Sequence, residues 1–162
     1  MPGPLWSDEQ HQAFLGRLTG SSRAVFAFGM HLHKLGWRIE IAPLVKSPNP
    51  GSNIAHVDSG DLFVLTPGKR TRFEVKGLLK TDFTSEADWP YPHLFFSNAP
   101  AVKRANGKVF AYVVLNRRLT HGALVRRTTH ESWYEQPCVP SNTGIREVNC
   151  CCPKHLVEWF EL

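Results

Sequence analysis

Two short apolar segments joined by a proline–glycine turn constrain the fold of this chain more than any other feature. Leu62 to Leu65 is apolar on both faces, as expected of a central strand. Arg72 to Lys76 alternates between apolar and polar residues, with Phe73 and Val75 on one face. The turn between the segments, Thr66 to Lys69, is short enough to reverse the chain directly. The sequence therefore predicts an antiparallel β-hairpin within a sheet.

Hydrophobic periodicity and turn residues place further elements on both sides of this hairpin. We expect two helices at 7–20 and 22–35, ended by Gly20 and Gly36, and the second is apolar enough to be well buried. Strands are expected at 37–41, 93–96 and 109–115, edge strands at 119–129 and 156–160, loops at 43–53 and 82–92, and a helix weakened by Pro100 at 98–106. The sum predicts an α/β (α+β sandwich) fold with a central mixed sheet of four to six strands flanked by helices.

Composition sets the class of protein and its partners. The 162 residues suit one compact domain, and 42% hydrophobic residues suffice for a core. No apolar run is long enough to span a bilayer, and the N-terminus does not resemble a secretory signal, so we expect a cytoplasmic protein. The net charge of +5 favours a polyanionic partner. The basic residues that form clusters are Lys103, Arg104 and Lys108, and then Arg117, Arg118, Arg126 and Arg127.

Three charged residues of the hairpin form a candidate catalytic group. Glu74 and Lys76 are two residues apart on one strand and so share a face, while Asp61 begins the partner strand, 74 − 61 = 13 residues earlier. Two carboxylates are hard oxygen ligands suited to Mg²⁺, and the backbone carbonyl of Val75 could add a third. A lysine beside such an ion could position the attacking water and stabilise a charged phosphate.

These residues resemble a known signature. Asp61-Leu62-Phe63-Val64 followed by Phe73-Glu74-Val75-Lys76-Gly77 is similar to the D…(D/E)-x-K motif of the PD-(D/E)XK nuclease superfamily. In that family a helix and a strand precede the hairpin, and a helix and a fourth strand follow it. The resemblance covers about residues 22–116, within a single nuclease-like domain (1–162) that has a restriction-endonuclease-like core and a C-terminal strand extension (117–162).

The resemblance also implies an activity, a cofactor and partners. The activity is DNA phosphodiester hydrolysis with Mg²⁺ or Mn²⁺, with Asp61, Glu74 and the Val75 carbonyl holding the metal and Lys76 catalytic. The basic clusters would hold DNA, and a homodimer is plausible. Many relatives carry a further glutamate in the helix before the first strand; here Glu9, Glu40 and Asp58 are the candidates. An incomplete acidic set would instead give an inactive nuclease-fold protein that binds nucleic acid or a protein partner.

The four cysteines allow two interpretations. Cys150, Cys151 and Cys152 are consecutive, and Cys138 precedes them. Their spacing fits a zinc site poorly, even with His155 as a fourth ligand, and favours reduced thiols in or beside a strand.

Overall fold

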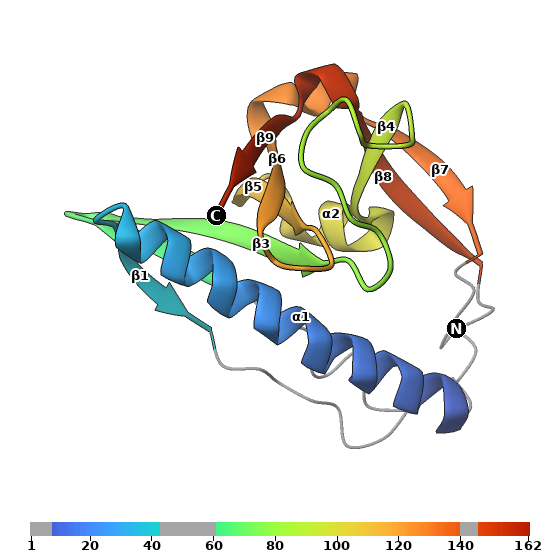
Figure 1. The fold of residues 1–162 in the computed structure, drawn as a ribbon, viewed down its shortest axis with the longest axis horizontal. Coiled ribbons are helices and arrows are strands. Elements are labelled where there is room, and N and C mark those ends of the chain that lie inside the picture. Colours follow the sequence, from blue (N-terminus) through green and yellow to red (C-terminus); the bar gives the residue numbers. More distant parts are fainter. Residues whose placement is uncertain (1–7, 43–60, 140–145) are drawn as a thin grey trace.

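A computed structural model describes residues 8–42, 61–139 and 146–162, and its centre is a six-stranded mixed sheet (Figure 1). The strand order is β1-β2-β3-β5-β6-β9, in which β3 and β5 are parallel and all other neighbours are antiparallel. The strands are β1 (Arg38–Ile41), β2 (Leu62–Thr66), β3 (Lys69–Gly77), β5 (Val109–Leu115), β6 (His121–Arg126) and β9 (Glu158–Glu161). The predicted mixed α/β class, the hairpin and the central strand at 109–115 are confirmed.

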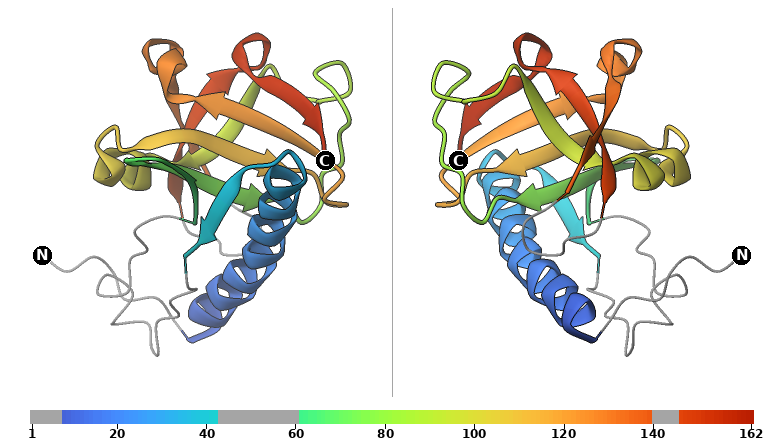
Figure 2. Two further views of the ribbon diagram at one scale, coloured as in Figure 1. Left: turned by 90° about the vertical axis from the view of Figure 1, so that its left-hand side faces the viewer. Right: turned by 90° about the vertical axis from the view of Figure 1, so that its right-hand side faces the viewer.

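A second sheet of three antiparallel strands covers part of one face of the first (Figure 2). Its order is β4-β8-β7, and the strands are β4 (His93–Asn98), β8 (Glu147–Pro153) and β7 (Tyr134–Cys138). Of these, the sequence predicted a range only for β4, and it placed the consecutive cysteines of β8 in or beside a strand. Two short 3-10 helices, η3 (Arg127–Ser132) and η4 (Lys154–Leu156), connect the strands of the two sheets.

The N-terminal helix α1 (Asp8–Lys34) is continuous, so the prediction of two helices divided at Gly20 is wrong. A single glycine costs a helix only about 1 kcal/mol, and no proline follows to block the hydrogen-bond ladder. Gly36 does end the helical segment, with a φ of 88° that favours glycine. The expected burial on all sides is also wrong, because Phe26 and Met30 are 60% and 54% exposed.

Each face of the six-stranded sheet has its own core. On one face, Phe28 and Leu32 of α1 pack against residues such as Phe73, Val75 and Val113. The opposite face packs against the second sheet and the segment before β4; its buried residues include Tyr112, Val114, Phe83, Leu94 and Cys152. Alternation along each strand assigns neighbouring residues to opposite faces, so β5 contributes to both cores, whereas β3 contributes Phe73 and Val75 to the core under α1.

The helix α2 (Ala99–Ala105) connects β4 of the second sheet to β5 of the first, and it confirms the helix expected at 98–106 (Figure 1). The Asn98 side chain accepts a hydrogen bond from the Ala101 N–H at 2.8 Å, and Asn106 ends the helix with a φ of 46°. Pro100 does not weaken α2, because it occupies the first turn, where no backbone donor is needed.

The C-terminal strands differ from the prediction in position. β6 is not at an edge: it pairs with β5 on one side and with β9 on the other. β9 occupies the edge, as expected for the segment 156–160. Among the described residues, no helix combines the length and apolarity needed to cross a membrane.

The consecutive cysteines give the fold a pH-dependent stability. Burial raises the pKa of the thiols of Cys150, Cys151 and Cys152, that of Cys151 to about 11 with added repulsion from neighbouring thiols. A folded-state pKa above the unfolded value stabilises the fold fully below about pH 9, and this stabilisation is lost as the pH rises through 11. We expect urea denaturation in a reducing buffer to show a decline of roughly 2–3 kcal/mol from Cys151 alone. Cys151→Ala should make this decline less steep; an unchanged slope would contradict the assignment.

Candidate active site

Glu74 and Lys76 project from β3 on the face opposite α1. The neighbouring residues Phe73 and Val75 are buried in the core under α1. Because side chains alternate along a strand, Glu74 and Lys76 share the other face. Glu74 is half-buried and lies beside Tyr112, its partner in the parallel pairing with β5, whereas Lys76 is exposed.

Asp61 directly precedes β2 and is attached to the backbone of β3. Its Oδ2 accepts a hydrogen bond from the Val75 N–H at 2.7 Å, and its own carbonyl accepts one from the Ala42 N–H at 3.0 Å. Leu62 pairs with Phe73, so one further step of this register sets Asp61 opposite Glu74. The hairpin thus brings the carboxylates of Asp61 and Glu74 to the same end of the sheet, with Lys76 one step further along β3.

Glu74 is held by an arginine of its own strand. The Arg72 Nε and Nη2 atoms donate to Glu74 Oε1 at 2.8 Å and 2.5 Å. Arg72 and Glu74 are both partly buried, which reduces the screening of this ion pair by solvent. The guanidinium therefore fixes the carboxylate and neutralises part of its charge.

The donor atoms at this place are all hard oxygens. A strand residue directs its N–H and C=O to the same side, so the Val75 carbonyl points to the side on which Asp61 binds the Val75 N–H. Across residues 8–42, 61–139 and 146–162, no group of three or more His, Cys, Asp and Glu side chains could hold a metal ion. Two carboxylates with one carbonyl still fit Mg²⁺, which needs one or two carboxylates and otherwise keeps its waters.

The further acidic candidates do not join this group where the structure describes them. Glu9 is exposed in the first turn of α1. It lies about 22 Å along the helix axis from Ala24, which is buried in the core between α1 and the sheet. Glu40 lies on the Glu74 face of the sheet but forms an ion pair with Arg70. Asp58 lies outside the described residues.

The predicted basic residues lie in three places: α2 and the turn after it, the β5–β6 turn, and the end of β6 with the start of η3, where Arg126 pairs with Glu158. Lys103, Arg104 and Lys108 belong to α2 and the turn after it, and Lys103 pairs with Glu135 at 2.8 Å. Arg117 and Arg118 occupy the β5–β6 turn and pair with Asp82 at 3.6 Å and 3.0 Å. This turn follows Leu115, the partner of Gly77 at the end of β3, and so lies at the same end of the sheet as Lys76.

Among the residues that the structure describes, the cysteines do not gather with other possible ligands into a group that could hold a metal ion. All four thiols are free, and Cys150 and Cys152 are buried in the core between the two sheets. Cys138 instead accepts a hydrogen bond from the Asn149 Nδ2. The interpretation as reduced thiols within a strand agrees with this arrangement.

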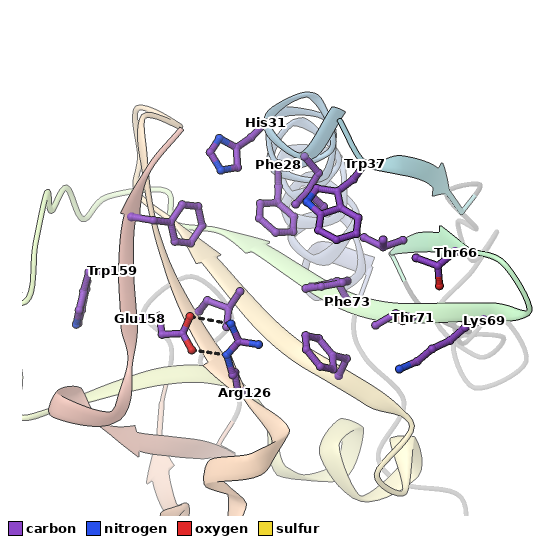
Figure 3. A pocket seen from close by; sticks show the side chains of 15 residues that line it. Phe28, His31, Trp37, Thr66, Lys69, Thr71, Phe73, Arg126, Glu158 and Trp159 are labelled. Carbon is purple, nitrogen blue, oxygen red and sulfur yellow. Dashed lines mark hydrogen bonds and ion pairs between the residues drawn. The ribbon is translucent and has the colours of Figure 1, made fainter. Parts of the chain in front are cut away.

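A cavity of about 580 Å³ lies on the other face of the sheet, lined by residues of α1 and of β2, β3, β5, β6 and β9. Figure 3 shows Phe28, Trp37 and Phe73 around it, with the Arg126–Glu158 ion pair at one side. Its lining is mostly apolar and includes none of the three candidate catalytic residues. The acidic pair and this cavity therefore lie on opposite faces of the sheet.

A smaller polar pocket of about 280 Å³ adjoins Glu74. Its lining includes Arg72, Ser97 and Tyr112, which the sequence did not single out, as well as Arg104. Tyr112 comes to lie beside Glu74 through the β3–β5 pairing, and Arg104 through the position of α2, so no local motif marks either residue. A spacing rule would have found Arg72 alone, since it lies two residues before Glu74.

Comparisons with protein-family models, curated proteins and solved structures found no match to this chain.

Proposed function

We propose that this protein is a metal-dependent nuclease of the PD-(D/E)XK type that hydrolyses DNA phosphodiester bonds. The observation that carries the proposal is the placement of Asp61 against the Val75 N–H, on the strand whose Glu74 and Lys76 share one face. The hairpin thereby brings three charged side chains together at one of its ends.

The order of elements supports a restriction-endonuclease-like core. The helix α1 and strand β1 precede the β2–β3 hairpin, and α2 and β5 follow it. The first four strands of the sheet are β1, β2, β3 and β5 in spatial order. This matches the helix–strand–hairpin–helix–strand arrangement expected from the sequence resemblance.

Each residue has a role that its position permits. Asp61, Glu74 and the Val75 carbonyl would hold Mg²⁺ or Mn²⁺, which supplies a more acidic water and neutralises charge on the phosphate. Lys76, exposed beside them, would orient the attacking water and stabilise negative charge on the phosphate. The basic groups at α2 and at the β5–β6 turn would hold the DNA backbone on either side.

A second candidate function is binding of nucleic acid without cleavage. The ion pair between Arg72 and Glu74 favours it, because a guanidinium there competes with a metal cation for the carboxylate. The described part of α1 from residue 22 onward also contributes no acidic side chain.

A cleavage assay separates these candidates. Plasmid and single-stranded DNA are incubated with Mg²⁺ or Mn²⁺, and with EDTA as the metal-free control. We expect metal-dependent cleavage that Lys76→Ala reduces on the order of 10²–10³-fold, because a preorganised cation beside the phosphate is lost. Lys69→Ala is the matched control, since Lys69 is also exposed on β3 but lies on the opposite face at the other end. Binding without cleavage at every metal concentration would support the second candidate.

A further inference from the structure

The pocket beside Glu74 has the character of an anion site. It lies between β3, β5 and α2, and its charged lining consists of Arg72 and Arg104 against the single carboxylate of Glu74. Arg72 is oriented by Glu74, with both donated hydrogen bonds directed to Oε1. Two guanidinium groups against one carboxylate leave a net positive charge within a partly enclosed space.

Arg104 distinguishes this pocket from an ordinary surface ion pair. The neighbouring Lys103 is paired with Glu135, but Arg104 forms no ion pair or hydrogen bond with any residue that the structure describes. A guanidinium presents a planar set of donors that matches the oxygens of a phosphate and binds them bidentately.

Tyr112 adds a neutral donor at the floor of the same pocket. The residue is only 3% exposed, and within the described ranges no group hydrogen-bonds its hydroxyl. A phenol hydroxyl is a neutral donor at physiological pH. Ser97, on β4, supplies a second hydroxyl to the lining.

From this set of donors we infer that the pocket is a subsite for a phosphate group of a nucleic acid strand, bound by Arg104 and Tyr112 with Arg72. The identity of the ligand rests on the proposed function, because this phosphate would lie beside the phosphodiester bond that is hydrolysed at Asp61 and Glu74. It assigns to Arg104 and Tyr112 a binding role that does not require a metal. The phosphate is either the terminal monoester of a strand or an internal diester.

Binding in EDTA tests the subsite separately from cleavage. Fluorescence anisotropy is measured with a labelled single-stranded oligonucleotide carrying either a 5′-phosphate or a 5′-hydroxyl. We expect Arg104→Ala to weaken binding about tenfold and to lower the salt slope by about one. Tyr112→Phe, which removes only the hydroxyl, should weaken binding about three- to tenfold. Preference for the 5′-phosphate would identify a terminal phosphate, and equal binding an internal one.

Arg23→Ala controls for net charge, because Arg23 is an exposed arginine of α1 on the other side of the sheet. The inference is overturned if Arg104→Ala and Tyr112→Phe bind as tightly as the Arg23→Ala variant while circular dichroism shows all of them folded. DNA cleavage in Mg²⁺ with unchanged binding by these variants would refute the subsite alone. If the wild-type protein does not cleave DNA but the two variants lose binding, the nuclease proposal is refuted and the subsite is retained.

Discussion

Asp61→Asn is expected to reduce the rate of metal-dependent cleavage by a factor on the order of 10²–10³ or more, while the fold stays nearly as stable as in the wild type. The two effects separate because Asp61 has two roles. Its Oδ2 accepts the Val75 N–H at 2.7 Å, and an asparagine carbonyl oxygen can accept the same hydrogen bond. The amide cannot supply the negative charge that a divalent cation requires of its ligands.

Asp61→Ala provides the comparison. Alanine removes the charge and also leaves the Val75 N–H without this acceptor at the start of the hairpin. We expect the same loss of cleavage together with a loss of about 1–3 kcal/mol in the free energy of unfolding, measured by urea denaturation. If Asp61→Asn cleaved DNA at the wild-type rate, the carboxylate would be only a structural acceptor, and the metal site proposed here would be wrong.

The hairpin and its charged residues could be predicted because the signals are local. Apolar runs of strand length around Pro67-Gly68 specify two strands and a turn, and Gly68 has a φ of 71° that suits glycine. The two-residue spacing of Glu74 and Lys76 then assigns their common face. The same reasoning found β5, whose seven residues are almost all apolar because both of its faces are covered.

The rest of the site depends on pairing that no local pattern encodes. The register between β3 and β5 is what sets Tyr112 beside Glu74, and these residues are 38 positions apart (112 − 74 = 38). The strand β7 was missed because it is exposed along most of its length, and the bounds of β8 were not predicted because its run of cysteines shows no alternation of apolar and polar residues. Without the second sheet, the sequence could not show that α2 and β4 contribute to a pocket beside Glu74.

The second large effect is expected at Asn116, a buried polar residue that organises the β5–β6 turn. Asn116 is 2% exposed, and its Nδ2 donates to the Phe83 carbonyl at 3.0 Å and to the Thr120 Oγ1 at 3.1 Å. Its Oδ1 accepts from the Thr120 N–H at 2.9 Å and from the His121 N–H at 3.3 Å. The amide therefore uses both its donor and its acceptor ends, and one of its partners is the carbonyl of the buried Phe83.

Asn116→Ala should lower the free energy of unfolding by about 2–4 kcal/mol, since it removes all four of these hydrogen bonds and leaves the buried Phe83 carbonyl without this donor. For a chain of this size that corresponds to a fall of roughly 6–12 °C in melting temperature, measured by calorimetry. Asn116→Asp should be at least as damaging, because it keeps the acceptor but sets a negative charge against the Phe83 carbonyl. The exposed Gln136→Ala variant should stay within about 0.5 kcal/mol of the wild type.

The same turn carries Arg117 and Arg118, so the hydrogen bonds of Asn116 should also matter for DNA binding. A turn loosened by Asn116→Ala should hold these two side chains less well and weaken binding even at temperatures where the protein is folded. Arg118→Ala should weaken binding without the loss of stability, because Arg118 is exposed and its pair with Asp82 is at the surface. Unaltered DNA affinity in both variants would remove the β5–β6 turn from the binding surface and leave only the basic residues around α2.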